Sequence, residues 1–189
     1  MSAELRYWDA NAFLAYFQEE VGRVDSCEAV LEEAESGRIL IVTSTLTLAE
    51  VLALRGQKKL PPKPAMKERV VKFFKNEYIA VQNVTREVAE LSRDLVWDNG
   101  IRPKDAIHVA SAMAADVAAF ETYDRPLIKK GNRVTKIVFR NPPARAQQAL
   151  ALKGGGRRAE PETNTEADET GRSSAITAIP EEGAGDRGQ

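Results

Sequence analysis

The chain has 189 residues, of which 43% are hydrophobic and 29% are charged, and its formal net charge is −1. These values are ordinary for a soluble globular protein that is long enough to bury one substantial core. The near-neutral charge balance does not by itself indicate any class of partner. No apolar run approaches the roughly 20 residues of a membrane span, and the N-terminus lacks a signal-peptide pattern, so we expect a cytoplasmic protein without membrane contact.

Strands and helices are predicted to alternate along the first 140 residues. Short apolar runs predict strands at 5–8, 39–42, 79–84, 117–120 and 134–139. Apolar residues at helical spacing predict helices at about 10–21, 26–36, 46–55, 70–74, 85–99 and 104–115. Residues 124–126 are predicted to form a turn, because aspartate and proline favour one there. This order is typical of an α/β fold in which helices cover a parallel sheet.

The alternating pattern fades after Pro142 and Pro143, so residues 1–143 are predicted to form one domain. Residues 144–189 are predicted to be a C-terminal extension, which begins with a short helix at 145–152. Beyond Lys153 the chain is rich in Gly, Glu, Thr, Ser and Ala and has few large apolar side chains. Such a segment cannot bury enough surface to offset its ordering entropy, so we predict that it is disordered.

Four acidic residues, Asp9, Glu50, Asp105 and Asp124, occupy comparable places in this pattern. Two follow predicted strands and two lie near the starts of predicted helices, which are positions that meet along one edge of a parallel sheet. Each also has a purely structural interpretation as a helix cap, a first-turn acid or a turn former. Four carboxylates at one edge repel one another unless a cation neutralises them, so together they predict a metal site.

The chemistry of this predicted site follows from the scarcity of other metal ligands. Cys27 is the only cysteine and His108 the only histidine, which excludes an internal disulfide and argues against a zinc site built from these residues. A metal must then be held by oxygen atoms, which favours Mg²⁺ or Mn²⁺. His108 lies three residues after Asp105, and we interpret it as a surface or hydrogen-bonded histidine without a catalytic role.

The segments around the four acids resemble those of PIN-domain ribonucleases. In size and pattern the chain resembles the VapC-like toxins of toxin–antitoxin pairs. The resemblance covers about residues 4–140 and is carried by the segments 9–11, 48–52, 104–112 and 121–127. It implies a three-layer α/β/α fold with a five-stranded parallel sheet. It also implies an endoribonuclease that uses Mg²⁺ or Mn²⁺ to hydrolyse RNA phosphodiester bonds, a cognate antitoxin as partner and pairing into a homodimer.

The resemblance assigns roles residue by residue. The positions that match the family's catalytic metal ligands are Asp9, Glu50, Asp105 and Asp124. Asn11 and Thr122 match the polar positions that accompany the acids, where they are expected to hydrogen-bond the carboxylates and metal-bound water.

A strongly basic stretch spans residues 55–75, in which Glu68 is the only acid. Lysine and arginine contacts to phosphates are largely independent of base sequence, so this stretch is a candidate surface for the RNA backbone. The residues that we select from it are Lys58, Lys59, Lys63, Lys67 and Arg69. Lys129, Lys130 and Arg133 are candidates to extend this surface. The alternative is a solvated helix face whose lysine stems cover apolar surface.

Two other functions are compatible with the sequence. One is a PIN-type nuclease that processes RNA and is not a toxin. The other is a non-catalytic α/β module that binds RNA or a protein, in which the acids serve only as caps. Metal-dependent cleavage of RNA would distinguish the nuclease from the non-catalytic module. Growth arrest on expression would distinguish the toxin from the RNA-processing nuclease.

Overall fold

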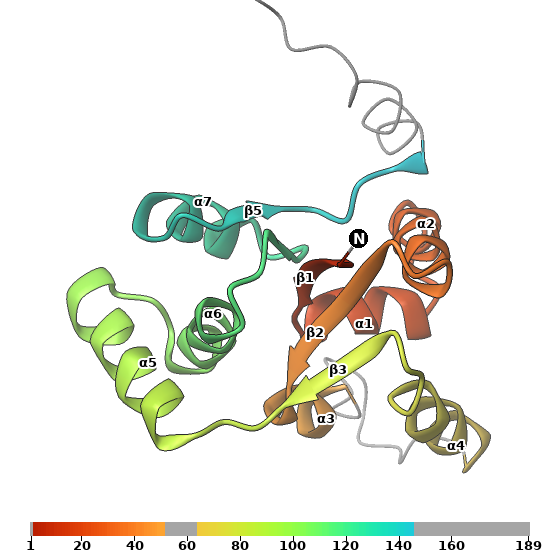
Figure 1. Cartoon of the computed structure of the whole chain (residues 1–189), viewed down its shortest axis with the longest axis horizontal. Helices are drawn as coiled ribbons and strands as arrows, with labels where there is room; N and C mark the ends of the chain where they lie inside the picture. The colour runs from red at the N-terminus through yellow and green to blue at the C-terminus, as the bar shows by residue number, and fades with distance from the viewer. Residues whose placement is uncertain (1, 52–63, 146–189) are drawn as a thin grey trace, which may run out of the picture. The chain divides into compact units, whose positions relative to one another are not determined.

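The computed structural model describes residues 2–51 and 64–145, and it shows helices and strands alternating along the chain (Figure 1). The strands are β1 (Glu4–Trp8), β2 (Ile39–Ser44), β3 (Ile79–Gln82), β4 (Ala119–Glu121) and β5 (Val138–Arg140). The helices are α1 (Ala10–Phe17), α2 (Val24–Glu35), α3 (Thr45–Glu50), α4 (Pro64–Phe73), α5 (Arg86–Asn99), α6 (Pro103–Ala114) and α7 (Arg125–Val134).

All five strands form one parallel sheet in the order β3-β2-β1-β4-β5. The central strand β1 pairs with β2 on one side, where Tyr7 lies opposite Val42, and with β4 on the other, where Tyr7 lies opposite Phe120. Each of the strands β1 to β4 is followed by at least one helix that returns the chain to the starting edge, which is the connection that parallel pairing requires. The predicted five-stranded parallel sheet is confirmed.

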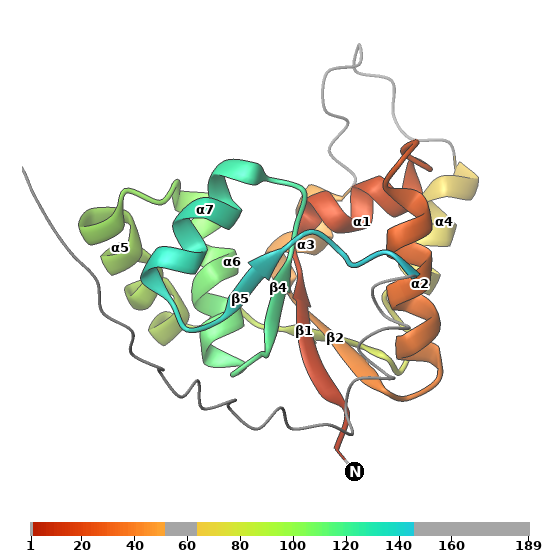
Figure 2. The ribbon, with the colours of Figure 1, turned by 90° about the horizontal axis from the view of Figure 1, so that it is seen from above.

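The two faces of the sheet bury different side chains, because successive residues of a strand point to opposite faces. Trp8 belongs to a core cluster that includes residues of α1, α2 and α4. Its neighbour Tyr7 belongs to a second cluster, with Phe120 and residues of α5, α6 and α7. Figure 2 shows these two groups of helices on opposite sides of the sheet. The predicted three-layer α/β/α arrangement is therefore confirmed.

The carboxyl end of β1 lies where the direction of strand addition in the sheet reverses. The chain moves from β1 to β2 on one side, and β4 is later added on the other side of β1. Open α/β sheets bind ligands at such a switch point, beyond the carboxyl ends of the strands. Asp9 is the first residue after β1, and Thr122 and Asp124 follow β4 at the same edge.

Several predicted element bounds are wrong. The helix predicted at 10–21 ends at Phe17, because Glu19 adopts a left-handed conformation with φ of 51°. The turn predicted at 124–126 is instead the start of α7, in which Asp124 is the N-cap and Pro126 lies in the first turn, a position that favours helix initiation. The strand predicted at 134–139 begins only at Val138, because α7 continues to Val134.

The described part of the chain leaves some predictions untested. Residues 52–55 of the helix predicted at 46–55, and residues 146–189 of the predicted C-terminal extension, lie outside it. Within residues 2–51 and 64–145, no helix combines the length and the apolar character needed to cross a membrane.

Candidate functional site

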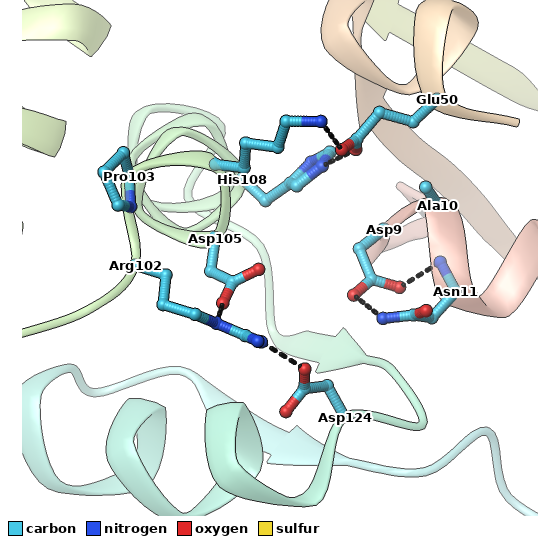
Figure 3. Close-up of a pocket in the computed structure, with 10 residues that line it drawn as sticks. Asp9, Ala10, Asn11, Glu50, Arg102, Pro103, Asp105, His108 and Asp124 are labelled. Atoms are coloured by element: carbon cyan, nitrogen blue, oxygen red, sulfur yellow. Dashed lines mark hydrogen bonds and ion pairs between the residues drawn. The ribbon is translucent and has the colours of Figure 1, made fainter. Parts of the chain in front are cut away.

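All four predicted acidic residues line one cavity of about 400 Å³ at the carboxyl edge of the sheet (Figure 3). They come from four separate elements: the end of β1, the end of α3, the first turn of α6 and the start of α7. The convergence that the sequence predicted for Asp9, Glu50, Asp105 and Asp124 is therefore present in the structure. Their catalytic role stays a prediction.

Asp9 is the most buried of the four, with 3% of its surface exposed. It is the N-cap of α1, and its Oδ1 accepts hydrogen bonds from the backbone N–H groups of Asn11 at 2.9 Å and Ala12 at 3.2 Å. Burial raises the pKa of Asp9, because a desolvated carboxylate is less stable when ionised. Among the described residues no lysine or arginine forms an ion pair with it, so its charge lacks a permanent counter-ion there.

Thr122 connects two of the acids. Its hydroxyl donates to Asp9 Oδ2 at 2.6 Å and accepts from the backbone N–H of Asp124 at 3.1 Å. Asn11 contributes a longer contact from Nδ2 to Asp9 Oδ2, at 3.4 Å. Asp124 in turn caps α7 by accepting from Leu127 N–H at 3.0 Å. Both polar positions that the family resemblance singled out thus contact the Asp9 carboxylate.

Arg102 bridges two acids and is a site residue that the sequence analysis missed. Its Nε donates to Asp105 Oδ2 at 2.7 Å and its Nη2 to Asp124 Oδ2 at 2.5 Å. The Arg102 side chain is 66% exposed, so solvent can reach it from the mouth of the cavity. The available signal was the spacing of Arg102 and Asp105, which are three residues apart at the start of a predicted helix.

Glu50 is held by two groups of α6. His108 Nε2 lies 2.8 Å from Glu50 Oε2, and Lys104 Nζ donates to Glu50 Oε1 at 3.2 Å. On its other side, His108 Nδ1 lies 2.9 Å from the Tyr7 hydroxyl. A neutral imidazole with its proton on Nε2 satisfies both contacts. The hydrogen bond from His108 lowers the pKa of Glu50 and keeps it ionised.

Two interpretations of this region need correction. His108 is buried and lines the cavity, so the surface alternative is wrong, although its hydrogen bonds were correctly anticipated. The interpretation of Glu50 as a helix cap is also wrong, because it is the last residue of α3 and the N-cap is Ser44.

The donor set suits a hard divalent cation, since every acidic group at the cavity offers carboxylate oxygen. In the residues that the structure describes, no three His, Cys, Asp or Glu side chains converge closely enough to hold an ion as they stand. Arg102 pairs with one oxygen of Asp105 and one oxygen of Asp124, so these two oxygens are engaged by a guanidinium and not by an ion. The residues therefore fit a Mg²⁺ or Mn²⁺ ion on condition that Arg102 releases these two acids.

The basic residues predicted to bind RNA lie away from this cavity or outside the described residues. Lys58, Lys59 and Lys63 fall in the segment 52–63, which the structure does not describe. Lys67 and Arg69 are exposed on α4, which does not line the cavity. Arg69 pairs with Glu19 at 3.5 Å. An RNA-binding role for these residues stays a prediction.

Comparison with known proteins gives a family and a fold. No curated protein matches the chain. Several solved structures are similar to it. One is a toxin–antitoxin complex from Klebsiella pneumoniae, with a TM-score of 0.51, 20% identity and coverage of 74% of this chain and 98% of that one. Another is VapBC2 from Rickettsia felis bound to a promoter DNA fragment, with a TM-score of 0.55, 17% identity and coverage of 72% and 98%. A third is VapC20 from Mycobacterium tuberculosis, described as a sarcin–ricin loop cleaving toxin, with a TM-score of 0.50, 16% identity and coverage of 65% and 92%. At these identities they show a shared fold, which is VapC-like. Residues 6–132 match the PIN domain family, and because this match spans more than half of the sequence, the chain belongs to that family.

Proposed function

We propose that this protein is a divalent-metal-dependent endoribonuclease that acts as the toxin of a toxin–antitoxin pair. The observation that carries the proposal is the convergence of four acidic side chains from four segments on one cavity of a PIN domain. PIN domains are nucleases, and oxygen-only donor sets of this kind suit Mg²⁺ or Mn²⁺.

In the proposed reaction, Asp9, Asp105 and Asp124 would hold the cation, and Glu50 would orient a water molecule or hold a second ion. A bound divalent ion lowers the pKa of a coordinated water and offsets the charge that develops on the scissile phosphate. The protein fixes the orientation of the carboxylates. Thr122 and the first turn of α1 fix the Asp9 carboxylate, and His108 fixes that of Glu50.

The proposed partners follow from the same family. The similar structure from Klebsiella pneumoniae is a toxin–antitoxin complex, which supports an antitoxin as the partner of this chain as well. We also propose that the protein acts in the cytoplasm as a homodimer. Expression of the wild-type chain should arrest growth, and co-expression of the cognate antitoxin should relieve the arrest. Growth that continues despite active nuclease would indicate an RNA-processing enzyme instead.

Removal of the metal should abolish cleavage. We expect the purified full-length protein to cut members of a panel of tRNAs and mRNAs in the presence of Mn²⁺, and to leave them intact in EDTA. Asp105→Asn should leave the RNAs intact even in Mn²⁺, because it removes one charged oxygen ligand from the cavity. Cleavage that persists in EDTA, or with Asp105→Asn at the wild-type rate, would refute the metal assignment.

Replacing Arg102 should strengthen metal binding. Arg102→Gln frees Asp105 and Asp124 from two ion pairs that the cation otherwise has to break. Exposed pairs contribute 0.2–1 kcal/mol each, so we expect a gain on the order of 1 kcal/mol, or about a fivefold lower dissociation constant for Mn²⁺ by titration calorimetry. Arg86→Gln, which removes an exposed arginine paired with Glu90 on α5, is the control and should change nothing. An unchanged or weaker affinity for Arg102→Gln would contradict this account.

A further inference from the structure

Helix α7 has one face packed on the sheet and one face in solvent. Leu127 and Gly131 are buried, and a Cβ atom added at Gly131 would clash with the ring of Phe139, so the helix backbone rests directly on β5. Arg125, Lys129 and Arg133 are exposed and recur at every fourth position, which places them on one side of the helix. They form a stripe about 12 Å long at 1.5 Å of rise per residue.

The charge of this stripe is not compensated within the described part of the chain. No ion pair there includes Arg125, Lys129 or Arg133, nor Lys136, which is exposed just beyond the end of α7. The sequence has no Asp or Glu from residue 125 to residue 159. The other helices differ, because arginine and lysine on α4 and α5 pair with acids at 19, 68, 90 and 94. The face of α7 is therefore a source of positive potential.

This basic face adjoins the acidic cavity. Asp124, which lines the cavity, is the N-cap of α7 and directly precedes Arg125. A second hollow of about 190 Å³ is lined by Arg102 and Asp105, shared with the cavity, and by Pro126 and Lys130 of α7. Figure 3 shows Asp124 and Arg102 reaching towards each other. Helix α7 therefore begins at the edge of the cavity, and Arg125 of the basic face directly follows a residue that lines it.

We propose that the exposed face of α7, with Arg125, Lys129, Arg133 and Lys136, is the surface along which the phosphate backbone of the RNA substrate lies as it enters the cavity. This inference rests on the proposed nuclease function and specifies where the substrate is held. The acids of the cavity repel a polyanion, so binding energy has to come from cations nearby. Phosphate contacts of this kind position the strand and do not read its sequence.

The test is the affinity of full-length protein for a fluorescein-labelled single-stranded RNA of mixed sequence, measured by anisotropy in EDTA, where cleavage is not expected. Lys129→Gln/Arg133→Gln removes two phosphate contacts. Each contact to a single strand contributes a slope of about 0.7 in log affinity against log salt. We therefore expect about 25-fold weaker binding at 0.1 M salt and a slope reduced by about 1.4. Both side chains are exposed, so the thermal unfolding temperature should not change.

Arg86→Gln/Arg93→Gln is the matched control, because it also removes two exposed positive charges, each of which has an acidic neighbour on α5. We expect its affinity to fall less than threefold. An equal loss in both variants, or a loss of less than threefold in the α7 variant, overturns the proposal. So does binding of polyglutamate as tight as that of RNA, which would assign the surface to an acidic protein. Cleavage of RNA in the presence of Mn²⁺ is measured separately. If the protein binds RNA through α7 but does not cleave it, only the nuclease function is refuted.

Discussion

Asp9→Asn should abolish RNA cleavage while leaving the fold intact. Asparagine is as good an N-cap as aspartate, and its Oδ1 can still accept from the backbone N–H groups of Asn11 and Ala12. Its Nδ2 takes the place of the Asp9 oxygen that accepts from Thr122, so the Thr122 hydroxyl has to become the acceptor. Asparagine lacks the negative charge that would balance a divalent cation. If the cation contributes about 4 kcal/mol to transition-state stabilisation, the rate of cleavage should fall about 10³-fold.

A second measurement separates loss of metal from loss of structure. The wild type should gain about 2.7 kcal/mol in unfolding free energy when Mn²⁺ is present at 100 times its dissociation constant, and Asp9→Asn should gain almost none. In EDTA the stability of the variant should stay close to that of the wild type, since a neutral amide is easier to bury than a carboxylate but loses the hydrogen bonds that Oδ2 accepts. A variant that retains both cleavage and stabilisation by Mn²⁺ would exclude Asp9 as a ligand.

Asp116→Asn is the control for this experiment. Asp116 is exposed beyond the far end of α6 from Asp105, and its φ of 50° is one that asparagine also tolerates. It removes the same charge from the same chain without touching the cavity. Its cleavage rate and its response to Mn²⁺ should equal those of the wild type.

Glu121→Ala should destabilise the protein by about 3 kcal/mol, because it breaks a buried ionic network. The side chain is fully buried, with 0% exposure. Its Oε1 lies 2.9 Å from Arg140 Nη2 and 3.8 Å from Arg6 Nη1, and its Oε2 accepts from the Trp8 indole at 2.9 Å. Removing the carboxylate leaves these donors in a site that water reaches poorly. The loss should be measured by urea denaturation with linear extrapolation.

Glu90→Ala provides the comparison for Glu121. Glu90 pairs with Arg86 on the exposed surface of α5 at 2.9 Å, and surface pairs contribute 0 to about 1 kcal/mol. A loss below about 1 kcal/mol is therefore expected for Glu90→Ala. If Glu121→Ala destabilised the protein no more than this, its carboxylate would not hold the cluster together.

Local sequence patterns predicted most of the architecture, because strand and helix periodicity report which side of an element is buried. The adjacent pair Tyr7 and Trp8 illustrates this, since each enters a different core. Helix α7 escaped prediction for a local reason. Its inner face contains a glycine, Gly131, instead of a large apolar residue, and Asp124 and Pro126 were interpreted as a turn when they are the start of a helix.

The sequence by itself determined that a parallel sheet carries acids at its carboxyl edge, because that conclusion needs only parallel strands and the positions of Asp9 and Asp124 directly after two of them. Only the tertiary structure decided which side chains pair with these acids. Arg102 and Asp124 are 22 residues apart, and His108 and Glu50 are 58 apart. Periodicity describes neighbours within one element, whereas these contacts depend on how α3, α6 and α7 are placed by packing on the sheet, and no local pattern encodes that placement.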